Sequence, residues 1–230
     1  MYKDVPRDVV SALKSQHPSL RCCIEWRRGL WVPAVRWVLG DTRRFEGKRV
    51  LDLGCRYGLM SCYFASLGAN VTGLDISTLA IKQARSLCTG LHFSGQLDFQ
   101  DYDGDLSAKL PPRSFDVVFT KSVLVVMGDL PSALKGIAQV LKPEGSLLAV
   151  ENAKGSSFLN LIRKYAIHRR WKQFDQVFSG MAFDSIGSFK YEFDQVHWRR
   201  FWGLVYAIRA ERPRVTHPNL PCCLPPAEAR

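Results

Sequence analysis

The chain of 230 residues is 47% hydrophobic and 23% charged, which is enough to bury one substantial core and leaves little room for a second independent domain. Its net charge of +11 favours an anionic partner, such as nucleic acid, an acidic lipid surface or a phosphorylated small molecule, without choosing among them. Because the basic residues are scattered rather than gathered in one run, a solvated surface explains them at least as well.

The seven cysteines do not predict a metal site. The adjacent pairs, Cys22-Cys23 and Cys222-Cys223, lack the spacing of two or more residues that zinc knuckles use. The odd number of cysteines, the charged first ten residues and the lack of an apolar run near about eighteen residues predict a cytoplasmic protein without a transmembrane segment.

Residues 1–46 are predicted to form an N-terminal helical cap. In this stretch Trp26, Leu30, Pro33 and Trp37 recur at intervals of about three to four residues, as apolar residues do on one face of a helix. The pattern changes after Gly47, where the main domain is expected to begin.

From residue 47 onward, strands and helices alternate. Short apolar runs predict strands at 49–53, 71–75, 97–100, 115–119, 146–150 and 201–209. Helices are expected at 59–67, at 78–88 with Ser77 as its cap, from the fourth strand through residue 130, and at 132–141, followed by a turn at 142–145. This alternation predicts an α/β fold, Rossmann-like, with a mostly parallel seven-stranded sheet and helices on both faces.

The domain is predicted to cover residues 47–211. An insertion at about 152–193, helical at first and then irregular, is expected to roof the substrate site together with the N-terminal segment. Residues 212–230 contain five prolines and are expected to form a flexible tail.

A glycine turn and an acidic residue indicate the binding site. Asp52 to Gly58 connects the first strand to a helix, where backbone N–H groups and the helix N-terminus can approach a ligand closely. Seventeen residues after Gly58, Asp75 ends the second strand, where a carboxylate can accept hydrogen bonds from both hydroxyls of a ribose.

These segments resemble the class I S-adenosylmethionine-dependent methyltransferases of the small-molecule kind called type 11. Residues 50–58 (VLDLGCRYG) are similar to the first motif of that family and residues 71–77 (VTGLDIS) to its second. Residues 115–119 (FDVVF) and 134–145 (LKGIAQVLKPEG) are similar to its later segment, which is the most specific match. The resemblance covers residues 49–151 in the family's order.

The resemblance implies that S-adenosylmethionine lies across the strand tips and leaves as S-adenosylhomocysteine. It places Asp52 and Gly54 by the methionine portion, Asp75 on the ribose, and Asp101 with Tyr102 at the adenine edge. The residues assigned to the cofactor are Asp52, Gly54, Cys55, Arg56, Gly58, Asp75, Ile76, Asp101, Tyr102 and Thr120.

The chain departs from the family pattern at two places that bear on the site. Arg56 replaces the middle glycine of the first motif, so its side chain either points to solvent or approaches the carboxylate of the cofactor. Val125 and Val126 stand where many members carry a histidine, which excludes a histidine base there. An NAD-binding Rossmann domain is the competing interpretation of the glycine turn, and the segment 142–145 disfavours it.

Methyl transfer from a sulfonium needs mainly proximity and alignment, so a base is optional. Glu151, at the tip of the fifth strand, and His168 are the catalytic candidates. For Glu151 the favoured interpretation is a capping or substrate-positioning carboxylate. The acceptor is expected to contact Trp31, Tyr165 and His197.

The sequence therefore predicts a methyltransferase that acts on a small molecule. If the net charge of the protein reflects its acceptor, that molecule is anionic. Oxygen is the first choice for the accepting atom, and nitrogen and carbon are left open. The first alternative is an RNA methyltransferase that modifies a ribose hydroxyl or a ring nitrogen, because basic clusters are interleaved with Trp171, Trp198 and Trp202. The second is a non-catalytic protein of the same fold that binds partners.

Overall fold

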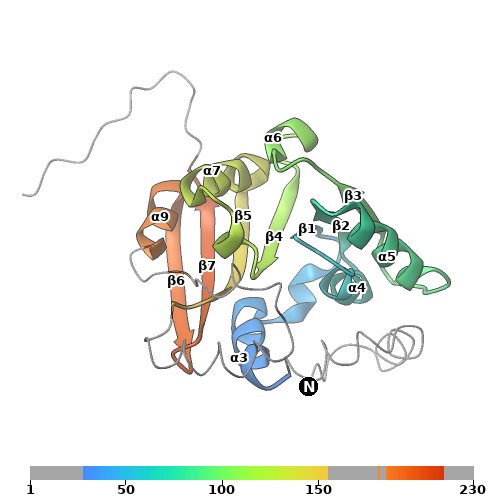
Figure 1. Ribbon diagram of the computed structural model, residues 1–230, viewed down its shortest axis with the longest axis horizontal. Coiled ribbons are helices and arrows are strands. Elements are labelled where there is room, and N and C mark those ends of the chain that lie inside the picture. Colours follow the sequence, from blue (N-terminus) through green and yellow to red (C-terminus); the bar gives the residue numbers. More distant parts are fainter. Residues whose placement is uncertain (1–27, 155–180, 182–184, 215–230) are drawn as a thin grey trace, which may run out of the picture.

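A computed structural model describes residues 28–154, 181 and 185–214 of the chain. Seven strands form one sheet in the order β3-β2-β1-β4-β5-β7-β6 (Figure 1). The strands are β1 Arg49–Leu53, β2 Asn70–Asp75, β3 Leu97–Asp101, β4 Phe115–Lys121, β5 Leu141–Asn152, β6 Phe193–Phe201 and β7 Val205–Pro213. β1 to β5 are parallel, whereas β7 runs antiparallel to both β5 and β6. The predicted α/β fold with a mostly parallel seven-stranded sheet is confirmed.

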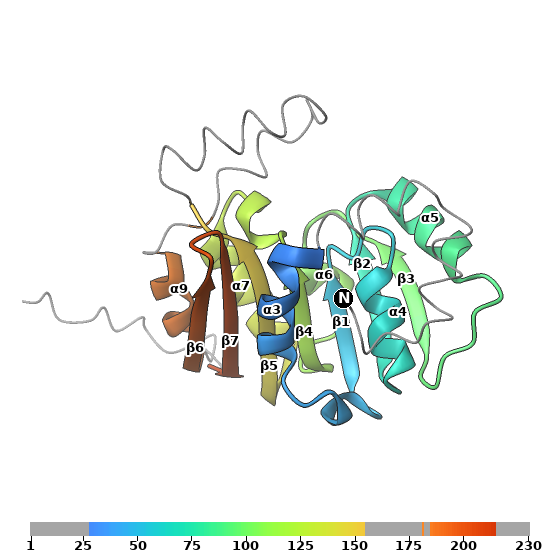
Figure 2. The ribbon, with the colours of Figure 1, turned by 90° about the horizontal axis from the view of Figure 1, so that it is seen from below.

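Helices cover both faces of this sheet (Figure 2). They are α3 Arg28–Leu39, α4 Leu59–Ser66, α5 Thr78–Cys88, α6 Leu106–Lys109, α7 Leu130–Val140 and α9 Ser185–Glu192, with 3₁₀ turns at Thr42–Phe45 and Leu124–Val126. Helices α3 and α4 pack on one face, and α7 and α9 pack on the other.

The central strands are mostly apolar because both of their faces are covered. In β1, Val50 packs into the cluster under α3 and α4, while its neighbour Leu51 packs into the cluster under α7 and α9. Val117 and Val118 of β4 divide between the two clusters in the same way. The period of two along each strand therefore builds two cores, one on each side of the sheet.

Helix α3 forms most of the described part of the predicted N-terminal cap, of which residues 1–27 lie outside the described residues. Its buried residues Ala34, Val35 and Val38 join the core on the face that it shares with α4. Arg209 of β7 donates from Nε to the Val38 carbonyl at 3.0 Å and lies 5.1 Å from the ring centroid of Trp37. The helix is thus fastened to the antiparallel end of the sheet.

The prediction of a helix between β4 and residue 130 is wrong. The structure has only the 3₁₀ turn Leu124–Val126, and α7 begins at Leu130. Asp129 caps α7 by accepting from the Ser132 N–H at 3.4 Å, and a proline occupies the first turn. The segment before α7 does not form an α-helix because the N–H groups of Val123, Leu124 and Val125 donate to the Glu151 carboxylate instead of to carbonyls four residues earlier.

The predicted turn at 142–145 lies within β5 instead. Phe115 pairs with Leu141 and Val117 pairs with Ser146, so residues 142–145 face the single residue Asp116 and bulge out of the ladder. The Asp116 carboxylate accepts from Lys142 Nζ, 2.9 Å from each oxygen, and from the Arg49 N–H at 2.9 Å. This carboxylate holds the bulge against the beginning of β1.

The last part of the sheet is a hairpin rather than the single strand predicted at 201–209. Trp202 and Gly203 have φ values of +54° and +65°, which reverse the chain between β6 and β7. β7 then continues to Pro213, inside the predicted tail, and residues 215–230 lie outside the described residues. Helix α9 also replaces an expected irregular stretch. β6 escaped prediction because it is an edge strand with a mostly exposed, polar sequence.

Replacing Asp116 with alanine is expected to lower the free energy of unfolding by about 1 to 2 kcal/mol, because the Arg49 N–H and the Lys142 ammonium lose their acceptor. Urea denaturation followed by circular dichroism measures this change. Glu144→Ala is the matched control in the same bulge, since its carboxylate is 86% exposed and 3.7 Å from Arg212, and we expect less than about 0.5 kcal/mol there. Equal losses in the two variants would contradict the bulge-anchoring role of Asp116.

Candidate functional site

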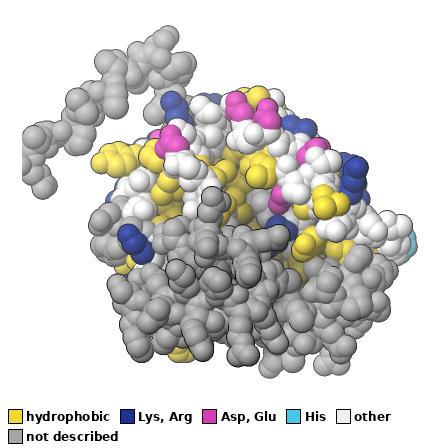
Figure 3. Space-filling view, viewed as in Figure 1, with side chains coloured by type: hydrophobic (Ala, Val, Ile, Leu, Met, Phe, Trp, Pro, Cys, Tyr) yellow, Lys and Arg dark blue, Asp and Glu magenta, His cyan; other side chains and the backbone are white. Residues whose placement is uncertain are grey.

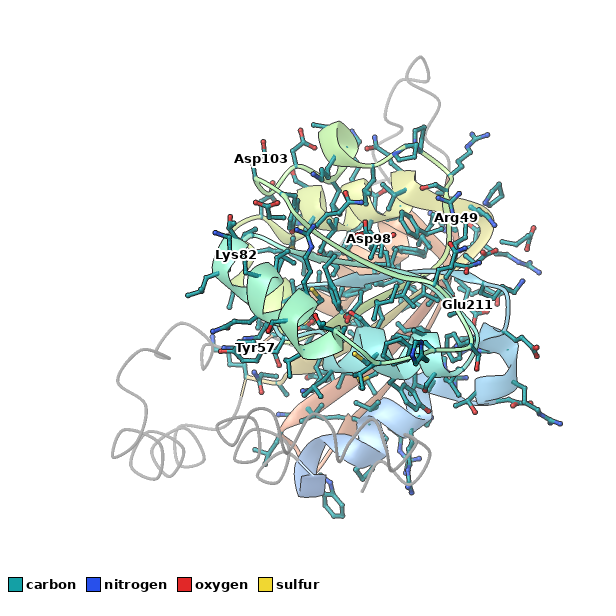
Figure 4. All side chains as sticks on the ribbon, turned by 90° about the vertical axis from the view of Figure 1, so that its right-hand side faces the viewer. Arg49, Tyr57, Lys82, Asp98, Asp103 and Glu211 are labelled. Carbon is teal, nitrogen blue, oxygen red and sulfur yellow. The ribbon has the colours of Figure 1, made fainter. Side chains whose placement is uncertain are left out.

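The predicted site residues gather at the carboxyl ends of the parallel strands. Leu53 pairs with Leu74 of β2 and with Thr120 of β4, so these three strands end at one edge. Figure 4 shows Tyr57 and Asp103, which follow β1 and β3, at the opposite end of the molecule from Arg49, which begins β1. In open α/β sheets ligands bind beyond this edge.

The turn after β1 is tightly bonded to β2. The N–H groups of Gly54 and Cys55 both donate to the Leu74 carbonyl, at 2.7 and 2.9 Å. At Gly54 the φ is +72°, and a Cβ there would lie 2.2 Å from Cγ2 of Val123. At Gly58 the φ is +74°, and a Cβ would lie 2.5 Å from Phe99. Both glycines are therefore needed, by backbone conformation and by close packing.

Arg56 occupies the same left-handed region without being a glycine. Its φ is +48°, a conformation that costs about 1 to 2 kcal/mol for a residue with a Cβ. The exposed side chain leaves the turn and places its guanidinium 5.5 Å from the ring centroid of Tyr57. Its N–H donates to Oδ2 of Asp75 at 2.9 Å.

Asp75 lies at the centre of this edge and is only 8% exposed. Its Oδ2 accepts from Arg56, and its Oδ1 accepts from the Ser77 N–H at 2.9 Å. Ser77 also caps α5, since its Oγ accepts from the Ala80 N–H at 3.2 Å. Each carboxylate oxygen keeps a further lone pair, so Asp75 can accept two additional hydroxyl groups.

Asp52 is a second buried acid beside the turn. Ser61 of α4 donates to Asp52 Oδ2 at 2.5 Å, and both side chains are almost fully buried. Burial raises the pKa of Asp52 to about 6, although the hydrogen bond from Ser61 opposes this increase. Sequence reasoning missed Ser61, whose only mark is that it is a small polar residue inside an apolar helical run.

Three further predicted residues border Asp75. Ile76 is 70% exposed at the tip of β2, an unusual position for a large apolar side chain. Asp101 ends β3 and pairs with Asp75 of β2. Its carboxylate accepts a hydrogen bond from Thr78 Oγ1 at 2.9 Å, which lowers the pKa of Asp101. Tyr102 donates its N–H to the Asp75 carbonyl at 3.3 Å, and burial raises its pKa to about 12.

Glu151 has no exposed surface and caps the loop after β4. Oε1 accepts from Thr120 Oγ1 at 3.3 Å and from the N–H groups of Val123 and Leu124 at 3.2 Å, and Oε2 accepts from the Val125 N–H at 3.4 Å. Burial raises the pKa of Glu151 to about 7, against these hydrogen bonds. The geometry is that of a capping carboxylate, and Thr120, itself fully buried, belongs to the same network.

Of the remaining candidates that the structure describes, Cys55 lies in the turn at this edge and His197 does not lie near it. His197 lies in the middle of β6, an exposed edge strand that β5 and β7 separate from β4. Cys55 is buried within the turn, and burial raises the pKa of its thiol. Trp31 lies in α3, and its side chain, like all of Tyr165 and His168, is outside the described part of the chain.

One face of the molecule exposes hydrophobic side chains (Figure 3). In this view they lie in the middle of the face, with acidic and basic side chains around them.

None of the helices in the described ranges has both the length and the apolar character needed to span a bilayer.

Comparison with known proteins identifies the central segment. Residues 51–149 match a family model described as a methyltransferase domain. The chain is 39% identical over 111 residues to a ubiquinone biosynthesis O-methyltransferase of Idiomarina loihiensis, across 48% of this chain and 45% of that protein. It is 37% identical over 113 residues to the protein of that name from Thiobacillus denitrificans, across 48% and 47%. The chain thus spans about half the length of these curated relatives.

Solved structures share the fold. A protein from Pyrococcus horikoshii gives a TM-score of 0.60 at 17% identity, over 83% of this chain and 91% of that one. A S-adenosylmethionine-dependent methyltransferase from Methanosarcina mazei gives 0.57 at 22% identity, over 73% and 93%. The fold is that of class I methyltransferases. The antiparallel β7 between β5 and β6 also departs from the strand order 3-2-1-4-5-6 of dinucleotide-binding domains, which overturns the NAD alternative.

Glu151 makes a pH-dependent contribution to stability. Because its pKa in the folded state, about 7, exceeds the ordinary value of 4.5, the folded protein binds more protons than the unfolded chain between these two values. The free energy of unfolding of the wild type, relative to Glu151→Gln, should therefore fall as pH rises through this window, by up to about 3 kcal/mol. Denaturant titrations of both proteins at several pH values measure it. A constant difference between pH 4.5 and 7.5 would show that folding leaves the pKa of Glu151 near its ordinary value.

Proposed function

We propose, from the premise that residues 51–149 belong to the methyltransferase domain family, that this chain transfers the methyl group of S-adenosylmethionine to a hydroxyl oxygen of a small molecule. S-adenosylhomocysteine is the second product, and the proton of the hydroxyl is released to water. The observation that carries the proposal is the buried carboxylate of Asp75, held at the tip of β2 by two backbone N–H groups beside a glycine turn. This is an acceptor site built for vicinal hydroxyls at the edge where such sheets bind nucleosides.

The residues of this edge fit the cofactor in four respects. Asp75 offers acceptors for a ribose, and the turn at Gly54 allows a ligand to approach the backbone closely. Exposed Ile76 offers an apolar surface for one face of an adenine, with Asp101 and Tyr102 beside it. Asp52, buried and bonded to Ser61, lies where the family places the methionine portion. Bound there, the cofactor supplies an electrophilic methyl group on a sulfonium.

The protein's own contribution to the reaction is binding and alignment. Because the sulfonium loses its methyl group to become a neutral thioether, which is a good leaving group, most of the acceleration comes from holding the acceptor oxygen in line with the methyl group and excluding water. In our proposal Glu151 contributes to this alignment without contacting the acceptor. It fixes the loop after β4, and Val123 of that loop packs on Gly54 in the turn. Glu151 is thus a positioning residue.

Oxygen is the proposed accepting atom because the curated relatives that share residues of the domain are named O-methyltransferases. An anionic acceptor agrees with the net charge of +11. Trp31 and Tyr165 as acceptor contacts, and His168 as a catalytic residue, stay part of the proposal on the strength of the sequence.

Asp75→Ala is expected to weaken binding of S-adenosylhomocysteine at least about tenfold, because a hydrogen bond to a charged group contributes about 1.5 to 3 kcal/mol. Isothermal titration calorimetry of wild type and variant measures this loss. Asp98→Ala is the matched control, because Asp98 is an exposed acid on the adjacent strand β3, and we expect unchanged affinity. Wild-type protein that binds neither S-adenosylmethionine nor its product would overturn the proposal and favour the non-catalytic alternative.

Glu151→Gln tests the positioning role in a radiolabelled methyl-transfer assay against phenolic and other hydroxyl acceptors. We expect kcat/KM to fall by less than about tenfold with the shape of the pH profile preserved, whereas loss of a general base costs about 10² to 10⁴. Thr120→Val removes the side-chain donor of the same network and should give a similar, modest loss. A much larger loss in Glu151→Gln alone would identify Glu151 as a base.

A further inference from the structure

Two cysteine side chains from different helices meet behind the cofactor edge. Cys62 is in α4 and Cys88 is the last residue of α5, and their Sγ atoms are 3.1 Å apart. Both are free thiols. Neither belongs to the proposed cofactor site, and the proposed methyl transfer uses neither of them.

We propose that Cys62 and Cys88 form a reversible disulfide when the protein meets a peroxide, and that this bond ties α4 to α5. An S–S bond is about 2.05 Å long, so the two sulfurs have to approach by about 1 Å. Cys88 is partly exposed and gives the oxidant access, whereas Cys62 is fully buried and is reached only through its partner. The pair therefore has one attacking and one resolving position.

The chemistry is complete with a peroxide as the oxidant. The hydrogen bond between the sulfurs lowers the pKa of Cys88 and, together with burial, raises that of Cys62. The Cys88 thiolate attacks one peroxide oxygen, the O–O bond breaks, and a sulfenic acid forms as hydroxide leaves and is protonated to water. The sulfur of Cys62 then attacks the sulfur of Cys88, and the S–O bond breaks. The proton of Cys62 leaves with that oxygen as a second water.

This bond connects to the cofactor edge through α4. The Cys62 N–H donates to the Gly58 carbonyl at 2.8 Å, and the preceding residue, Ser61, holds Asp52. The chain segment closed by the disulfide includes β2 with Asp75. Drawing the first turn of α4 toward α5 therefore shifts the turn at Gly58, and we expect the oxidised protein to bind S-adenosylhomocysteine several-fold more weakly. This last consequence rests on the proposed function.

Peptide mapping of the wild-type protein tests the bond without any need for activity. After treatment with hydrogen peroxide, blocking of free thiols and digestion with trypsin, the expected product is peptide 57–82 joined to peptide 86–109, lighter by two hydrogens than the pair and separated by dithiothreitol. Each peptide contains one cysteine, so the assignment is unambiguous. Both cysteines recovered as blocked thiols, or Cys88 joined to Cys55 instead, would overturn the proposal.

Thermal unfolding gives a second measurement. A cross-link that closes a segment of this length should raise the melting temperature of the oxidised wild type by about 5 °C or more, and reduction should reverse the increase. Cys62→Ser and Cys88→Ser should show no increase, whereas Cys55→Ser, a change to a nearby buried cysteine, should keep both the cross-link and the increase. Calorimetry with S-adenosylhomocysteine on reduced protein tests the proposed function, and the same titration on oxidised protein tests the coupling, so the two failures are distinguishable.

Discussion

The carboxylate of Asp75 lies almost wholly out of water, and a charged group in that position has to be hydrogen-bonded. Two backbone N–H groups donate to it, that of Arg56 in the turn after β1 and that of Ser77 at the cap of α5. Because one side chain joins the turn to the helix cap, the backbone at the carboxyl edge is held in a single arrangement. That arrangement leaves the outer lone pairs of Asp75 for a ligand. The site is thus prepared by the folded chain before any cofactor arrives.

A second buried acid, Glu151, fixes the backbone on the other side of the turn. Glu151 binds three consecutive N–H groups after β4, which places Val123 directly over Gly54. In the described residues, therefore, the turn at the cofactor edge is fixed from β2 by one carboxylate and from β5 by another. The cost of burying Glu151 is visible in its raised pKa. Its side chain serves the loop, which explains why a carboxylate at the tip of β5 need not touch the acceptor.

Much of this site was predictable because strand tips can be located from sequence. Short apolar runs located β1 to β4; the glycine turn follows the first of them, and Asp75 ends the second. Ser61 and Val123 were not predictable, since their roles come from distant residues that only the folded sheet brings together. The hairpin of β6 and β7 was misassigned for a local reason: Trp202 adopts a left-handed conformation that its residue type does not indicate. The helix expected between β4 and residue 130 was wrong for a tertiary reason, since the N–H groups of that segment donate to Glu151 from β5.

Arg56 shows how a departure from a family pattern can be accommodated by hydrogen bonding. A glycine would adopt the left-handed conformation without strain, whereas arginine bears a cost of about 1 to 2 kcal/mol. The conformation nevertheless aims the Arg56 N–H at Asp75, and a hydrogen bond to a buried carboxylate is worth about as much as the strain. The outward side chain then lies against Tyr57 and leaves the space beyond the turn to the backbone. The substitution therefore changes the surface around the cofactor edge while the acceptor geometry at Asp75 is preserved.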